Sequence, residues 1–219
     1  METLLKIALF AHIIAGFVAL ITGLCAMITK KGGKTHRLNG KIFFYSMLLV
    51  SASAIFISLV RTNMFLLMVG IFAFYQNYSG YRAIHNKSLR LSIADKLVLF
   101  AATINSGFMI FSFNPVLVVF GFISGSLVID DFRIYLLLAR NKEIPKSQWL
   151  VKHIGMMTGS YIATFTAFLV VNVQNFNPYW LPWLAPTLLF VPLIIYWTRK
   201  YGKEPKSILV QTSESKNAD

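Results

Sequence analysis

Residues 4–41 read LLKIALFAHIIAGFVALITGLCAMITKKGGKTHRLNGK, an apolar run followed directly by a cluster of basic residues. The apolar part exceeds the roughly 20 residues that an α-helix needs to cross a bilayer. The same alternation of apolar run and basic connection continues to residue 200. A bilayer explains it, because cytoplasmic connections retain Lys and Arg whereas translocated ones lose them. The stretch therefore predicts a membrane protein whose N-terminus lies outside and whose basic connections lie in the cytoplasm.

The basic residues fall into four clusters, at Lys30–Lys41, Arg82–Lys96, Arg140–Lys152 and from Arg199 onward. Of the 21 Lys and Arg residues, only Lys6, Arg61 and Arg133 lie outside these clusters. A net charge of +13 placed in this way favours contact with anionic lipid head groups at the cytoplasmic face over binding of nucleic acid. The same placement predicts that the C-terminus lies in the cytoplasm.

The composition excludes a soluble fold. Hydrophobic residues make up 56% of the 219 residues, charged residues 13%, and the mean hydropathy is +0.63, whereas soluble domains contain about 25% charged residues. The single cysteine, Cys25, excludes an internal disulfide. Only Lys6, together with Glu2, lies near the start of the first apolar run, whereas Lys30, Lys31 and Lys34 follow it. A signal peptide has the opposite arrangement, so this run is expected to remain as a helix.

Seven segments are long enough to span the membrane, and they predict an all-α bundle over residues 1–202. They are Leu4–Ile28, Ile42–Val60, Met64–Ala83, Leu97–Phe113, Val116–Leu138, His153–Val173 and Trp180–Trp197. Short connections at 61–63, 114–115 and 174–178 predict that the helices they join are antiparallel neighbours. Aromatic residues at the ends, among them Tyr179 and Trp180 outside and Trp149, Trp197 and Tyr201 inside, are typical of interfacial belts. The polar tail 203–219 is predicted to be disordered.

Two of these helices carry small residues at four-residue spacing. The first has Ala11, Ala15, Ala19 and Gly23, and the sixth has Gly155, Gly159, Ala163 and Ala167. Small residues let helix backbones approach closely in lipid, so these strips predict packing seams within the bundle or toward a membrane partner or second copy.

Ionisable residues inside a membrane are costly and mark candidate sites. The fifth predicted helix contains Asp130 and Asp131, with Arg133 three residues after the first. One interpretation is an ion pair at the interface, extended to Arg82. The other is a catalytic or proton-carrying role, or a place on a transport path.

Three histidines, His36, His85 and His153, are predicted at a similar depth on the cytoplasmic side. Together with the aspartates they could bind a metal such as zinc, which takes three protein ligands plus water, or haem b, which takes two imidazoles. The alternative is that they are only solvated and hydrogen-bonded, because no pair has a ligand spacing such as HxxxH. His12 lies apart in the outer half, and Asn105 and Ser106 are its candidate partners.

The segment Phe74–Arg82 is unusually polar for a membrane helix. Gln76, Asn77 and Tyr78 need partners or water there. We expect a ligand pocket at this place, opening to the cytoplasm; the alternative is a hydrogen-bonded seam between helices. The predicted ligand-binding set is His36, His85, His153, Asp130, Asp131, Arg82, Tyr78 and Gln76.

Several short motifs resemble a bacterial integral-membrane family that is catalogued as a domain of unknown function. They are His12 followed by Gly16 and Gly23, Lys31-Gly32, His36-Arg37-Leu38-Asn39-Gly40, Ser79-Gly80-Tyr81-Arg82, and Trp149-Leu150 followed by His153, Met157 and Gly159-Ser160-Tyr161. The resemblance implies a multi-helix architecture in the bacterial cytoplasmic (inner) membrane and no established activity.

Three functions remain open from the sequence. The first is a membrane protein that binds a small ligand, metal or haem in a cytoplasmic-side His/Asp/Arg pocket. The second is an ion- or proton-coupled transporter that uses Asp130 and Asp131. The third is a non-catalytic partner subunit. The sequence assigns no reaction.

Overall fold

The computed structural model describes residues 1–173, 177–178 and 180–202. This part of the chain forms seven α-helices and no strand: α1 (Glu2–Ile28), α2 (Lys34–Val60), α3 (Met64–His85), α4 (Ile93–Ile110), α5 (Pro115–Ala139), α6 (Gln148–Asn172) and α7 (Leu181–Tyr201). The predicted all-α fold is therefore confirmed. Gln174, Tyr179 and the predicted disordered tail lie outside the described residues.

Several helices extend beyond the predicted apolar segments. α2 begins at Lys34 rather than Ile42, and α6 begins at Gln148 rather than His153. Hydropathy detects only the part of a helix that lies in hydrocarbon, whereas backbone hydrogen bonding continues into the polar interface. As a result His36 lies in the first turn of α2 instead of preceding the helix.

Six of the seven described helices are long and apolar enough to cross a membrane. The exception is α3, whose C-terminal half contains the polar segment Phe74–Arg82. α3 packs against α2, α4, α5 and α6, so protein rather than lipid covers most of its surface. Helices joined by short turns pack as neighbours, as predicted: α2 with α3, α4 with α5, and α6 with α7.

Local sequence explains the ends of these turns. The Asn63 side chain accepts a hydrogen bond from the Leu66 amide and caps α3, and Asn114 caps α5 ahead of Pro115. After α1, Gly32 adopts φ +76°, a left-handed conformation that glycine reaches without steric cost. This turn directs the chain back into α2.

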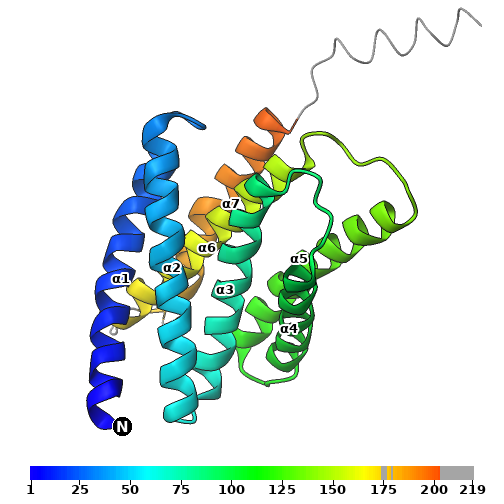
Figure 1. The fold of residues 1–219 in the computed structure, drawn as a ribbon. Coiled ribbons are helices and arrows are strands. Elements are labelled where there is room, and N and C mark those ends of the chain that lie inside the picture. Colours follow the sequence, from blue (N-terminus) through cyan, green and yellow to red (C-terminus); the bar gives the residue numbers. More distant parts are fainter. Residues whose placement is uncertain (174–176, 179, 203–219) are drawn as a thin grey trace, which may run out of the picture.

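α3 lies in the middle of the bundle, with α1 and α2 on one side, α4 and α5 on the other, and α6 and α7 behind it (Figure 1). The chain begins at one end of the bundle, and α7 finishes at the opposite end (Figure 1). We call this second end the basic end, because the connections 29–33, 86–92 and 140–147 lie there. The assignment of the basic end to the cytoplasm remains a prediction.

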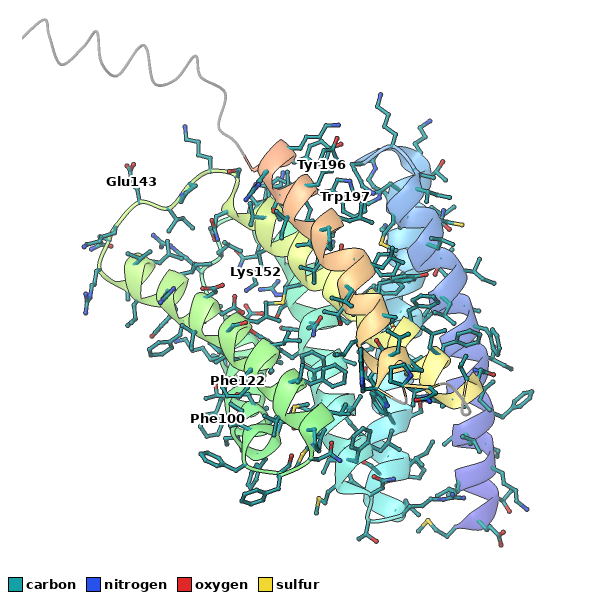
Figure 2. All side chains as sticks on the ribbon, turned by 180° about the vertical axis from the view of Figure 1, so that it is seen from behind. Phe100, Phe122, Glu143, Lys152, Tyr196 and Trp197 are labelled. Carbon is teal, nitrogen blue, oxygen red and sulfur yellow. The ribbon has the colours of Figure 1, made fainter. Side chains whose placement is uncertain are left out.

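Close packing occurs where small residues allow it. Ala15, Ala19 and Gly23 of the first predicted seam are buried, whereas in the second strip Gly159 closely faces Gln76 and Gly155 faces open space. The outer surface is apolar: Phe100 on α4 and Phe122 on α5 are largely exposed (Figure 2), as expected of residues that face lipid.

Candidate functional site

A cavity of about 630 Å³ opens at the basic end. Its walls come from α1, α2, α3, α6 and α7, together with Lys31, Gly32 and Lys87 of the connections. Ligand pockets typically measure about 300–1,000 Å³ and are largely apolar. This cavity therefore has the size of a site for a small molecule.

All three predicted cytoplasmic-side histidines line this cavity. Nδ1 of His36 lies 2.8 Å from the Ala26 carbonyl oxygen, Nδ1 of His153 2.8 Å from that of Gly80, and Nδ1 of His85 3.0 Å from that of Tyr81. A carbonyl oxygen only accepts, so each Nδ1 carries the proton and donates it. In the neutral imidazole this leaves Nε2 with a free lone pair.

The interior of the cavity is apolar and partly aromatic. Its lining includes Met27, Phe43, Ile154, Met157 and Tyr161. Gly40, one turn after His36, also lines it, and a Cβ at that position would meet nothing within 4 Å. The glycine of the His-Arg-x-x-Gly motif therefore leaves space in the cavity.

We call the part of the lining that comes from the connections and the first two turns of α2 the cavity mouth, and it is cationic. Lys31, Arg37, Lys41 and Lys87 belong to it, and the lining residues of the cavity include no Asp or Glu. Partial burial lowers the pKa of the Lys31 ammonium, because leaving water disfavours its charged form. The Lys31 ammonium also donates to the carbonyl oxygens of Ala26 and Met27. An anion next to these four residues would meet positive charge that no carboxylate of the lining neutralises.

Two of the lysines make cation–π contacts with tryptophans that also line the cavity. Lys31 Nζ lies 4.1 Å from the centre of the Trp197 ring, and Lys87 Nζ lies 4.8 Å from that of Trp149. Such cation–π contacts position the ammonium groups. Trp197 extends from α7 near the basic end (Figure 2). Trp149, Trp197 and Tyr201, predicted as an interfacial belt, thus contribute to the cavity wall.

A second, much smaller cavity of about 30 Å³ lies among α3, α4, α5 and α6. Two ion pairs border it. Arg82 donates to both carboxylate oxygens of Asp95 at 2.8 and 2.9 Å, and the Tyr78 hydroxyl donates to the same carboxylate at 2.9 Å.

The other ion pair joins α5 and α6. Lys152 Nζ lies 2.7 Å from Asp131 Oδ1, and the Tyr75 hydroxyl donates to Oδ2 at 2.9 Å. Lys152 extends from α6 on the side of α5 (Figure 2). Each carboxylate therefore has a basic partner and a tyrosine.

The eight predicted ligand-binding residues do not share one pocket. The three histidines line the large cavity, whereas Tyr78, Arg82 and Asp131 line the small one. Asp130 is exposed and pairs with Arg133 at 3.6 Å. Gln76 is buried against Gly159 and lines neither cavity. Their ligand-binding roles stay predictions.

Two predicted partnerships are wrong. Arg82 does not extend the Asp130–Arg133 pair, because Asp95 at the start of α4 binds it instead. His12 bonds Ser53 and the Val50 carbonyl of α2 rather than Asn105 or Ser106. The reason is that α1 packs against α2 and α6, while Asn105 bonds the Met68 carbonyl of α3.

The described residues contain no group of three or more His, Cys, Asp or Glu arranged to hold a metal ion. The structure thus gives no support to a zinc site built from His36, His85 and His153, although these residues line one cavity.

Sequence reasoning missed the ion-pair partners Asp95 and Lys152 and the aromatic walls of the large cavity. Asp95 had a detectable signal, since Ser92 and Asp95 form a capping box at the start of α4. Lys152 had none, because its partner Asp131 lies on another helix. Lys31, Arg37 and Lys41 line the large cavity, but nothing in the sequence indicated this, because the bilayer already explains the basic cluster to which they belong.

Residues 9–94 match DUF2306, a family described as predicted membrane proteins. The resemblance noted from the sequence is confirmed over this range, which includes His12, His36 and His85 but not His153. No curated protein and no solved structure matches the chain.

Proposed function

We propose that this membrane protein binds an amphipathic anion, with the apolar part inside the large cavity and the anionic group at its mouth. One observation carries the proposal: an apolar cavity of about 630 Å³ whose lining includes four Lys or Arg residues and no Asp or Glu. Fatty acids, lysophospholipids and haem, through its propionates, belong to this ligand class.

In a membrane the polar contacts must provide the selectivity. An apolar tail gains little by leaving lipid for an apolar cavity, because both surroundings are equally apolar. A carboxylate or phosphate gains from charge-assisted hydrogen bonds to Arg37, Lys41 or Lys31. Discrimination is therefore expected between an anionic amphiphile and its neutral analogue, rather than between chain lengths.

The proposal includes the orientation of the site. With basic connections retained in the cytoplasm, the cavity opens at the inner face of the membrane. Anionic lipids at that face attract basic protein segments, and each Lys or Arg near the surface contributes about 1 kcal/mol to this attraction. A ligand would enter from the cytoplasm or from the inner leaflet.

Native mass spectrometry of the purified protein tests the proposal. Lysophosphatidate is the probe, and a monoacylglycerol with the same chain is the neutral comparison. We expect preferential retention of lysophosphatidate, and an approximately tenfold loss, about 1.4 kcal/mol, in the double variant Arg37→Gln/Lys41→Gln. Lys34→Gln is the matched control, because Lys34 lies in the same turn of α2 but does not line the cavity.

A second pair of variants tests the cavity itself. Gly40→Leu places a side chain in open space at the cavity wall and should reduce retention without lowering thermal stability. Gly125→Leu on α5 also enters open space, away from the cavity, and should leave retention unchanged. Equal retention of the anionic and neutral probes, or unchanged retention in Gly40→Leu, would show that the cavity is not the binding site.

A further inference from the structure

We infer that the amphipathic anion is a haem, whose iron is coordinated by His153 Nε2 with His36 Nε2 on the opposite side. The inference rests on the proposed function, since the same cavity holds the ligand. The inference goes beyond the binding of an anionic group at the cavity mouth, because it adds direct bonds from two imidazoles to the iron.

The hydrogen bonds of the two rings suit this role. Histidines that bind metal usually donate their other ring N–H to a carbonyl or carboxylate, which fixes the tautomer and the ring orientation. His153 on α6 donates to Gly80 on α3, and His36 on α2 donates to Ala26 on α1. Each ring is therefore held by a neighbouring helix, with Nε2 free to bind.

The two rings also share one cavity, because both His36 and His153 are among the residues that line it. His85 is the less suitable ligand. It is exposed, its hydrogen bond stays within its own helix, and its ring lies 4.3 Å from that of Tyr81 at an angle of 36°.

Haem suits the cavity better than a bare metal ion does. A zinc site typically needs three or four protein ligands, and the described residues include no such group. A porphyrin supplies four nitrogens itself, so the protein must provide only one or two axial ligands. The aromatic rings of Trp149, Trp197 and Phe43 offer apolar surface to the macrocycle, and Arg37 and Lys41 offer charge to two propionates.

Absorbance of the protein expressed with a haem precursor, and titration of the purified protein with haemin, test the inference. After reduction with dithionite, we expect a Soret band with the resolved α and β bands of a six-coordinate ferrous haem. His153→Ala should weaken haemin binding by at least the 10–100-fold that loss of a supporting partner typically costs, and His36→Ala should give a five-coordinate spectrum. His12→Ala is the matched control, since His12 also bonds a backbone carbonyl but does not line the cavity.

Chemical rescue separates loss of a ligand from loss of folding. Added imidazole should restore the six-coordinate spectrum of His36→Ala if the cavity is intact. Lysophosphatidate retention that survives in a protein without any haem spectrum would overturn the haem assignment and leave the anion site standing. If the wild-type protein binds neither lysophosphatidate nor haemin, both proposals are overturned. Equal spectra in His153→Ala and His12→Ala would exclude His153 as a ligand.

Discussion

Asp130 and Asp131 are adjacent in the chain and on the same helix, yet their surroundings are opposite. The side chain of Asp131 is 6% exposed and lies 2.7 Å from Lys152, whose side chain is 12% exposed. The side chain of Asp130 is 67% exposed and lies 3.6 Å from Arg133, which is 72% exposed. The two Asp→Asn substitutions therefore form a matched pair: the chemical change is the same, but the two carboxylates differ in burial and in their partners.

The expected magnitudes follow from this difference. Asp131→Asn leaves the Lys152 ammonium buried without a counter-charge, and breaking a buried pair in this way costs about 3–5 kcal/mol. Asp130→Asn removes a solvated contact worth about 0–1 kcal/mol. Adding Lys152→Met to Asp131→Asn removes the orphaned charge, so the double variant should be more stable than Asp131→Asn alone. Tyr75 keeps an acceptor in either case.

Equilibrium unfolding in mixed micelles with increasing dodecyl sulfate, followed by circular dichroism, measures these differences. We expect a clear loss of stability for Asp131→Asn, partial recovery in the double variant and little change for Asp130→Asn. If both single variants lose equal stability, or if the double variant is as unstable as the sum of its parts, then the pair does not stabilise α5 against α6 as argued.

Three further outcomes are expected. Gly23→Leu should destabilise by about 1–3 kcal/mol, because a Cβ there would lie 2.4 Å from the Tyr161 ring, whereas Gly16→Leu enters open space and should be tolerated in the same unfolding assay. Ser92→Ala removes the α4 cap and one partner of Asp95, which should lower the midpoint of unfolding by the equivalent of about 0.5–2 kcal/mol. Of two reporters fused after residue 202, the one that is active only in the cytoplasm should give a signal. A signal from the one that is active only after export would contradict the proposed orientation.

The helices were largely predictable because hydrocarbon imposes length and apolarity on each span. The same constraint made the short turns informative, so α2 and α3, and likewise α4 and α5, were correctly predicted as neighbours. Helix ends were less predictable: the start of α2 at Lys34 lies in the polar interface, where hydropathy no longer reports on the backbone. Depth along the membrane normal also placed His36, His85 and His153 at one level, and they do line one cavity.

Position around the bundle could not be predicted. Depth in the membrane does not show that Asp131 is buried while Asp130 is exposed. Nor does it show that Arg82 pairs with Asp95 rather than with an aspartate of α5. Those choices depend on which face each helix turns to its neighbours, and hydrophobicity is nearly uniform around several of these helices. His12 shows the same limit, since its depth was compatible with Asn105 until the packing of α1 on α2 placed it beside Ser53.

The central position of α3 explains why it can be less apolar than the other helices, since protein surrounds it. Its polar residues also line both cavities. Tyr78 and Arg82 lie one turn apart and line the small cavity, whereas Tyr81 and His85 lie one turn apart on a neighbouring face and line the large one. Polar groups persist at membrane depth only where protein or a cavity, rather than lipid, covers them. A polar helix enclosed by apolar ones therefore indicates where the bundle opens, and Gly80, whose carbonyl holds His153, joins that helix to the candidate site.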